Sequence, residues 1–226
     1  MTNIRILLNL HLLLVLTGCD NINFEKIKHD FSKEDLEYFT EIAFGSEFRN
    51  NKTKYEPSLR YWKSDINVHL NGHYTVDDSI EVLRVIAELN ELINTIDISL
   101  VGNFGNVNIY FDCPSTFYNF PGFVPGNAGF FCVKRFRIFP NGYILIDKWK
   151  SFNWRKHLIR EELTQILGLM SDSYSYPESI FFQGWTDINE YSEIDRQLIR
   201  LLYNYNLPFG MKKSDFIQLI NNIKSE

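Results

Sequence analysis

One stretch of this sequence combines a helical pattern with a carboxylate on the wrong side of the helix. When successive residues of 154–172 are spaced about 100° apart, the apolar ones fill one arc. That arc contains Leu158, Ile159, Leu163, Ile166, Leu167, Leu169 and Met170. Glu162 falls inside the arc, whereas His157, Glu161 and Gln165 lie on the opposite side. Because burying a bare carboxylate is costly, Glu162 needs a partner, a proton or a function.

Two roles are open for Glu162. In the structural role, the carboxylate pairs with backbone amides or with a basic side chain and holds the helix to the rest of the fold. The basic candidates are Lys148, Arg155, Lys156 and Arg160. In the functional role, Glu162 is a general acid or base whose pKa is raised by the neighbouring charge of Glu161. The structural role is favoured, since no nucleophile or metal is evident to complete a mechanism.

The N-terminus has the pattern of an export signal. Residues 6–16 are almost wholly apolar, follow Arg5, and end at Leu16-Thr17-Gly18-Cys19. The apolar run is too short to span a bilayer and is typical of a signal peptide. A small residue before a cysteine resembles the bacterial lipobox, which implies that residues 1–18 are removed and that Cys19 is lipidated, with palmitate among the acyl groups. The alternative is a short membrane anchor with an incidental cysteine.

The lipobox resemblance also implies a location. The mature protein would be attached to a membrane through its N-terminal lipid, on the periplasmic side of the bacterial cell envelope. Asp20 follows the lipidated residue, and in enteric bacteria that residue implies retention at the inner membrane. Residues 19–30 would then form a tether, and residues 31–226 a single domain.

Composition supports one folded domain after the signal. Hydrophobic residues make up 45% of the chain and aromatic residues 15%, which excludes a disordered protein. The net charge is -5 and no basic stripe is present, so no nucleic-acid partner is expected. Once Cys19 is lipidated, Cys113 and Cys132 remain, and in an exported protein they are expected to form a disulfide. The alternative is two free thiols.

The order of predicted elements indicates an α+β domain. Helices are expected at 31–48, 75–96, 154–172, 188–203 and 214–223, and strands at 59–70, 98–101, 106–111, 129–138 and 143–147. Asn141-Gly142 predicts a hairpin between the last two strands. Ser32, Ser192 and either Thr75 or Asp77 are candidate N-caps. In the helix at 75–96 the predicted buried stripe consists of Ile80, Leu83, Ile86, Ala87, Asn90 and Ile93.

The helix at 154–172 resembles the active-site helix of metzincin-like zincins. Their motif, His-Glu-x-x-His-x-x-Gly-x-x-His or Asp, places two zinc-binding histidines one turn apart around a glutamate that polarises water. The aligned residues here are Glu161, Glu162, Gln165, Gly168 and Ser171, followed by Asp172. The glutamate and the glycine are therefore present, and both helix histidines are replaced.

The resemblance extends over residues 59–205. Ser179-Ile180-Phe181 stands where metzincins have the Met-turn, and Ser192 to Tyr203 matches their closing helix. More closely, the chain resembles a bacterial family of exported proteins with a domain of unknown function, through its Arg-Glu-Glu-Leu-x-Gln-x-Leu-Gly-Leu core. The resemblance implies a mixed twisted sheet, a long backing helix, an active-site-type helix and C-terminal helices.

The departures from the motif argue against a standard zinc site. Zinc sites take most of their ligands from His or Cys, whereas Glu161, Gln165 and Asp172 offer oxygen only. Such a set would suit calcium or magnesium better, although three side chains make a thin cage. His157 could add a nitrogen, or it is a surface or cap residue. No cofactor is therefore expected.

Three functions remain open. The favoured one is a membrane-anchored lipoprotein with a degenerate metallopeptidase-like domain that binds a peptide or an envelope component without rapid hydrolysis. The second is a divergent hydrolase that uses Glu162 with an unusual metal or a carboxylate pair. The third is a structural or interaction domain in which the site is a vestige.

Overall fold

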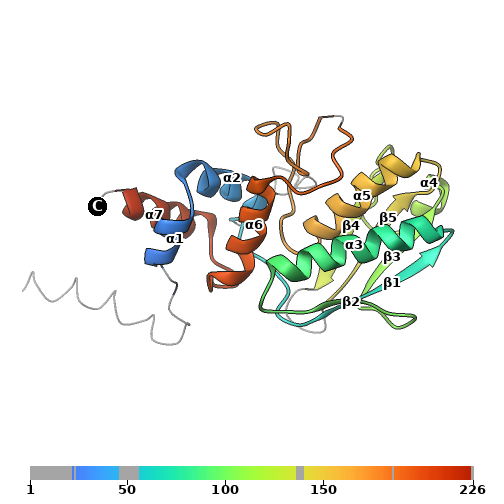
Figure 1. The fold of residues 1–226 in the computed structure, drawn as a ribbon, viewed down its shortest axis with the longest axis horizontal. Helices are drawn as coiled ribbons and strands as arrows, with labels where there is room; N and C mark the ends of the chain where they lie inside the picture. The colour runs from blue at the N-terminus through green and yellow to red at the C-terminus, as the bar shows by residue number, and fades with distance from the viewer. Residues whose placement is uncertain (1–21, 23, 46–55, 136–139, 185, 225–226) are drawn as a thin grey trace, which may run out of the picture.

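The computed structural model describes residues 22, 24–45, 56–135, 140–184 and 186–224. Figure 1 shows their arrangement, with a mixed sheet at one end and a group of helices at the other. The elements are α1 (Phe24–Asp30), α2 (Lys33–Phe44), β1 (Ile66–Gly72), α3 (Val76–Leu92), β2 (Ile98–Leu100), β3 (Val107–Asp112), α4 (Pro114–Phe117), β4 (Gly129–Arg135), β5 (Asn141–Asp147), α5 (Phe152–Gln165), α6 (Glu193–Asn204) and α7 (Lys213–Lys224).

The strands form one sheet in the order β2-β1-β3-β5-β4. All neighbours are parallel except β4, which runs antiparallel to β5 and forms an edge of the sheet. Asn141 and Gly142 belong to β5 rather than to the turn, because Gly142 pairs with both Val107 and Val133. The predicted pairing of these two strands is confirmed, although the Asn-Gly pair does not form the turn.

One face of the sheet is covered by helices, and the other face is covered in part. Helices α3 and α5 pack against each other and lie across one face (Figure 1). The other face carries a smaller aromatic cluster under the segment between β3 and β4, made of Phe117, Phe130, Tyr143 and Leu145. At the far end, α2 packs against α6 and α7. The predicted α+β class, with a mixed sheet, a backing helix, an active-site-type helix and C-terminal helices, is confirmed.

Three helices begin where the sequence predicted them. Ser32, Thr75 and Ser192 each cap a helix through a capping box, in which the cap hydroxyl and an aspartate three residues later exchange hydrogen bonds with the backbone. Thr75, not Asp77, is the cap of α3. Each box satisfies backbone N–H groups that the first helical turn leaves unpaired.

Two predictions about the first half of the chain are wrong. The strand expected at 59–70 begins only at Ile66. The stripe expected on α3 is also misplaced, since Ile80 and Leu83 are 57% and 50% exposed while Val82, Val85 and Leu89 are buried. Apolar residues occur around most of this helix, and the buried side also contains Asp78 and Glu81. Ion pairs with Arg155 and Arg84 allow these two carboxylates to be buried. Because it carries them, the true buried face looked polar in the sequence.

The predicted disulfide is also wrong, because Cys113 and Cys132 are free thiols. In the sheet, Cys132 on β4 lies opposite Tyr143 on β5, and Tyr143 lies opposite Asn108 on β3. Cys113 follows the end of β3, five residues beyond Asn108, which separates the two cysteines by about 16 Å along the strands. A disulfide needs Cα atoms within about 7 Å.

The segment expected to be a tether contains α1, whose Ile27 is fully buried. Cys19 and the signal region lie outside the described residues. Among the residues that the structure does describe, no helix is both long and apolar enough to cross a membrane.

Candidate functional site

The helix α5 begins after a serine cap and ends at Gln165, three residues before Gly168. The Ser151 side chain accepts a hydrogen bond from the backbone of Trp154. At the other end, Trp62 Nε1 donates to the Ile166 carbonyl at 2.8 Å and the Tyr203 hydroxyl donates to the Leu167 carbonyl at 2.9 Å. These bonds satisfy carbonyls that the end of a helix leaves unpaired.

Gly168 makes the sharp turn that the sequence motif predicted. Its φ of +129° lies where L side chains are rare. A Cβ atom at this position would overlap the carbonyl oxygen of Arg60 and lie 3.3 Å from Leu202 Cδ2. The chain after α5 is therefore fixed by a close backbone contact that only glycine permits.

A cavity of about 260 Å³ lies between α5 and the segment that follows it. Its lining consists of Trp154, His157, Leu158, Glu161, Asp172, Phe182, Gln183, Gly184 and Thr186. Two carboxylates and a histidine thus share one space with two aromatic side chains. His157 and Glu161 lie one helical turn apart, on the side of α5 where zincins carry metal ligands.

The polar residues of this cavity bond to one another and to the backbone. Gln165 Nε2 donates to Asp172 Oδ1 at 2.5 Å. His157 Nδ1 donates to the Ile188 carbonyl at 2.7 Å, and its Nε2 lies 3.5 Å from Glu161 Oε2. Burial lowers the pKa of His157, so the imidazole is held in its neutral form. The structure therefore brings together the four predicted positions His157, Glu161, Gln165 and Asp172.

These residues do not fit a zinc ion. The three positions aligned with zinc ligands supply carboxylate, amide or hydroxyl oxygen, and the amide of Gln165 already donates to Asp172. Within the described part of the chain, no three His, Cys, Asp or Glu side chains are arranged to hold a metal ion. Ser171, at the third ligand position, packs against Gly45, where a Cβ atom would overlap it.

Glu162 lies on a different side of α5 and faces β4. Its side chain is 5% exposed, and a Cβ atom on Gly129 would lie 3.2 Å from Glu162 Cδ and 2.9 Å from Leu158 Cδ2. Glycine at the first residue of β4 therefore makes room for the carboxylate. The carboxylate is adjacent to the cavity, because Leu158 touches Gly129 and also lines the cavity.

Three of the four basic residues proposed as partners of Glu162 form other ion pairs. Lys148 pairs with Asp112 at 3.5 Å, Arg155 with Asp78 at 2.8 Å and Arg160 with Glu88 at 2.7 Å. The last two pairs join α5 to the backing helix α3. Lys156 lies over the ring of Phe152.

The turn at 177–181 is held by a buried hydrogen-bond network. Ser179 Oγ donates to Asp195 Oδ1 at 2.5 Å, and the Ile180 N–H donates to Asp195 Oδ2 at 3.1 Å. The Tyr38 hydroxyl donates to Ser179 Oγ at 2.9 Å, which the sequence did not predict. Burial raises the pKa of Asp195, even though these donors act in the opposite direction. Ser179, Ile180 and Phe181 are therefore a fixed support beside the cavity.

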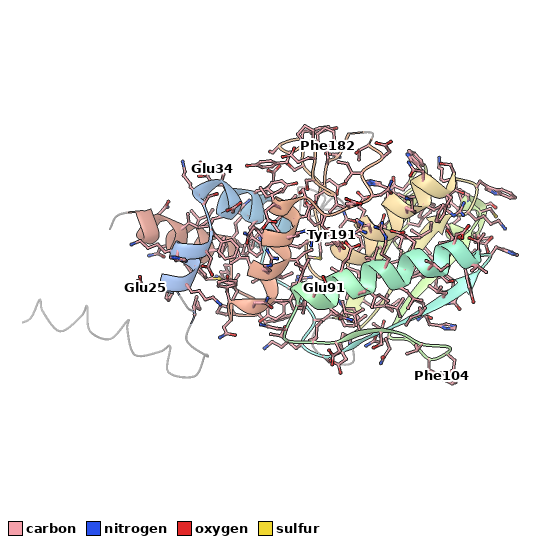
Figure 2. The ribbon with its side chains drawn as sticks, in the orientation of Figure 1. Glu25, Glu34, Glu91, Phe104, Phe182 and Tyr191 are labelled. Atoms are coloured by element: carbon pink, nitrogen blue, oxygen red, sulfur yellow. The ribbon has the colours of Figure 1, made fainter. Side chains whose placement is uncertain are left out.

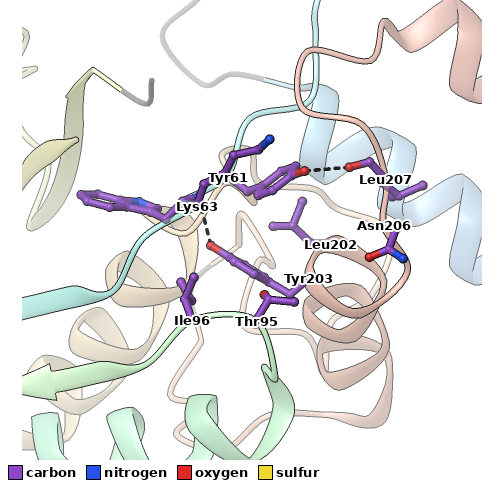
Figure 3. Close-up of a pocket in the computed structure, with 9 residues that line it drawn as sticks. Tyr61, Lys63, Thr95, Ile96, Leu202, Tyr203, Asn206 and Leu207 are labelled. Carbon is purple, nitrogen blue, oxygen red and sulfur yellow. Dashed lines mark hydrogen bonds between the residues drawn. The ribbon is translucent and has the colours of Figure 1, made fainter. Parts of the chain in front are cut away.

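Two other hollows lie away from α5. One, of about 250 Å³, separates α6 from the segment before β1; there the Tyr61 hydroxyl donates to the Leu207 carbonyl, and Tyr203 accepts from the Trp62 backbone (Figure 3). The other, of about 420 Å³, is lined by Glu34, Glu37, Tyr38, Glu41, Ser175 and Tyr176. The sequence predicted neither hollow.

The fold and this site define an α+β domain with a pocket beside α5 that is poor in metal ligands. Residues 33–222 match the family described as "Protein of unknown function (DUF2927)", and the chain belongs to this family. No curated protein matches the sequence.

Two solved structures resemble the chain weakly. "Structure of Myroilysin" has a TM-score of 0.40 and 13% identity, over 64% of this chain and 81% of that one. "Crystal structure of myroilysin" has a TM-score of 0.40 and 12% identity, over 83% of this chain and all of that one. Values this low do not assign an activity.

Proposed function

We propose that this protein is a lipid-anchored component of the bacterial cell envelope whose domain binds an extended peptide without cleaving it. The anchor would be the acylated Cys19, on the periplasmic side of the membrane. The observation that carries the binding proposal is the cavity beside α5, because it occupies the metal-ligand side of this helix and contains residues that suit recognition better than zinc binding.

The cavity suits one basic side chain. Its volume of about 260 Å³ is at the small end for a ligand pocket. Glu161 and Asp172 supply two carboxylates, and Trp154 and Phe182 supply aromatic walls. A lysine or arginine side chain matches this lining, since its apolar stem can contact the rings while its charged group meets the carboxylates.

The edge strand β4 offers a place for the peptide backbone. It pairs with β5 on one side and ends the sheet of the described residues on the other. An extended peptide can add to such an edge through backbone hydrogen bonds. Gly129, the first residue of β4, contacts Leu158 of the cavity wall. A peptide along β4 would therefore pass the cavity entrance.

A peptide-binding assay tests this function. The probes are fluorescent ten-residue peptides that differ only in a central Lys, Arg, Ala or Glu. We expect the Lys and Arg peptides to bind best. The double variant Glu161→Gln/Asp172→Asn should bind these two peptides at least about tenfold more weakly, because two charge-assisted hydrogen bonds are lost. The control, Glu34→Gln/Glu37→Gln, makes the same charge change in the hollow beside α2. Equal binding of all peptides, or equal loss in both variants, would contradict the proposal.

A divergent hydrolase is the second candidate, and the burial of Glu162 against Gly129 beside the cavity is the observation that favours it. Glu162→Gln separates the two functions. If a peptide-cleaving activity exists and this variant abolishes it without lowering thermal stability, Glu162 is a catalytic residue. If only stability falls, the carboxylate is structural. Stoichiometric, tightly held metal in purified protein would contradict a non-catalytic site.

The anchor has its own test. Cells that express the protein are grown with a labelled fatty acid, and acylation of the wild type is compared with that of Cys19→Ser. We expect the variant to lose the label completely. Continued labelling would place the modification elsewhere.

A further inference from the structure

A group of lysine and aromatic side chains projects from the turn between β5 and α5 and from the first turns of α5. We call it the basic–aromatic tip; it consists of Lys148, Trp149, Lys150, Phe152, Trp154 and Lys156. Trp149 is 73% exposed and Phe152 38% exposed. This end of α5 lies at the opposite end of the molecule from α1 (Figure 1).

The lysines of the tip lie over its aromatic rings. The Nζ atom of Lys150 is 4.4 Å from the ring centroid of Trp154, and that of Lys148 is 5.1 Å from the ring centroid of Trp149. Lys156 Nζ is 5.8 Å from the ring of Phe152. Cation–π contacts of this kind order long side chains at the surface. The tip is therefore an arranged surface of alternating charge and ring.

The tip keeps positive charge in an acidic protein. Lys148 is neutralised by Asp112 at 3.5 Å, and the adjacent Arg155 by Asp78. No carboxylate of the described residues lies within ion-pairing distance of Lys150 or Lys156. The whole chain has a net charge of -5, so an anionic surface would repel most of the molecule and attract this end.

We propose that the basic–aromatic tip docks the domain onto an anionic lipid surface. An exposed indole flanked by lysines matches the headgroup layer, because the ring body is apolar, its N–H can find an acceptor, and the ammonium groups meet lipid phosphates. Two unneutralised lysines are too few for a nucleic-acid footprint. The tip shares Trp154 with the cavity beside α5, and its other residues lie outside the cavity lining.

The tip alone binds weakly, and a second attachment would make it effective. Each lysine at an anionic surface strengthens binding by about fivefold, so Lys150 and Lys156 together account for about 25-fold. A protein already held at a membrane presents the tip at a high effective concentration. If the N-terminal anchor is correct, the chain that leads into α1 would hold one end of the domain at a membrane, and the tip at the opposite end from α1 would provide a second attachment.

Vesicle binding of the full chain tests the proposal. Protein is added to vesicles of phosphatidylcholine alone or of equal parts phosphatidylcholine and phosphatidylglycerol, and bound protein is measured by sedimentation. The triple variant Trp149→Ala/Lys150→Ala/Lys156→Ala is compared with the control Phe104→Ala/Lys33→Ala/Lys212→Ala. The control removes an exposed ring and two lysines elsewhere; Phe104 lies below the sheet, away from α5 (Figure 2). All variants keep the same N-terminus, so its contribution to binding cancels.

We expect the wild type and the control to prefer the anionic vesicles, and the triple variant to lose this preference by at least about 25-fold. Added salt should weaken the wild-type preference. The proposal is wrong if the triple variant keeps the preference while circular dichroism shows it folded, or if the wild type has none. Lys150→Glu, a single substitution at a half-buried position, repeats the test if the triple variant does not fold.

Fluorescence quenching locates the contact. Brominated phosphatidylglycerol should quench more of the tryptophan emission in the wild type than in Trp149→Phe, which keeps an aromatic ring at this position but removes the fluorescent indole. Equal quenching would place Trp149 outside the bilayer and overturn the docking. Tighter binding to DNA or heparin than to the vesicles, without quenching by brominated lipid, would identify a general polyanion site and would also overturn it.

Discussion

The turn after α5 gives the most exacting prediction, because replacing Gly168 by alanine should disrupt both the backbone and the packing there. The φ of +129° disfavours any side chain, and such strain costs about 1–3 kcal/mol. The new Cβ would also lie 3.1 Å from the Arg60 carbonyl carbon and overlap its oxygen. Overpacking of this kind adds about 1–3 kcal/mol.

We therefore expect Gly168→Ala to lower the free energy of unfolding by about 2–6 kcal/mol. That is a large part of the 5–15 kcal/mol, roughly, that stabilises a typical domain. Two other glycines separate the contributions. Gly126 has a φ of +101° but no atom near a built Cβ, and Gly102 has neither a positive φ nor a close neighbour.

Urea unfolding, followed by circular dichroism, measures the series. Gly126→Ala should lose about 1–2 kcal/mol through backbone strain alone, and Gly102→Ala should be neutral or slightly stabilising. If Gly168→Ala falls within about 1 kcal/mol of the wild type, or matches Gly126→Ala, the contact with Arg60 does not fix the turn.

Three further predictions concern other parts of the site. Burial lowers the pKa of His157 below its usual 6.5, so the unfolded chain binds this proton more tightly than the folded protein does. The free energy of unfolding should therefore fall as the pH drops from 7 through 6.5, by at most about 1.4 kcal/mol per pH unit, and level off below the folded pKa. Urea titrations at several pH values measure this slope, which His157→Gln should remove. Asp195→Ala should lower the free energy of unfolding by about 2–4 kcal/mol, because the Ser179 hydroxyl and the Ile180 N–H would lose their acceptor. Thermal melting measures this change, and a loss below about 0.5 kcal/mol would contradict the stabilising role of the network. Cys113→Ser/Cys132→Ser should leave the melting temperature of the oxidised protein unchanged, since both thiols are free. If reductant lowers the melting temperature of the wild type but not of this variant, the two cysteines form a disulfide after all.

Features decided by nearby residues were predictable from the sequence. The caps Ser32, Thr75 and Ser192 depend on hydrogen bonds within three residues, and the glycine after α5 belongs to a local motif. The helix predicted at 154–172 was found for the same reason, although α5 ends at Gln165. His157, Glu161 and Asp172 from its predicted polar side do line a cavity.

Features decided across the fold were not predictable. The buried side of α3 carries Asp78, which tolerates burial because Arg155 of α5 pairs with it. No pattern within the helix reports such partners. Strand register likewise separates Cys113 from Cys132, and Tyr38 reaches Ser179 across 141 residues of sequence.

The way in which the end of α5 is fastened bears on how this family could diversify. Trp62, Tyr203 and Gly168 fix the helix terminus, and none of them lines the cavity beside α5. Substitutions at Glu161 or Asp172 therefore leave the supports of the helix in place. If the cavity binds a peptide as proposed, its recognition can change without rebuilding the scaffold, so relatives with one architecture would be free to select different ligands through a few cavity positions.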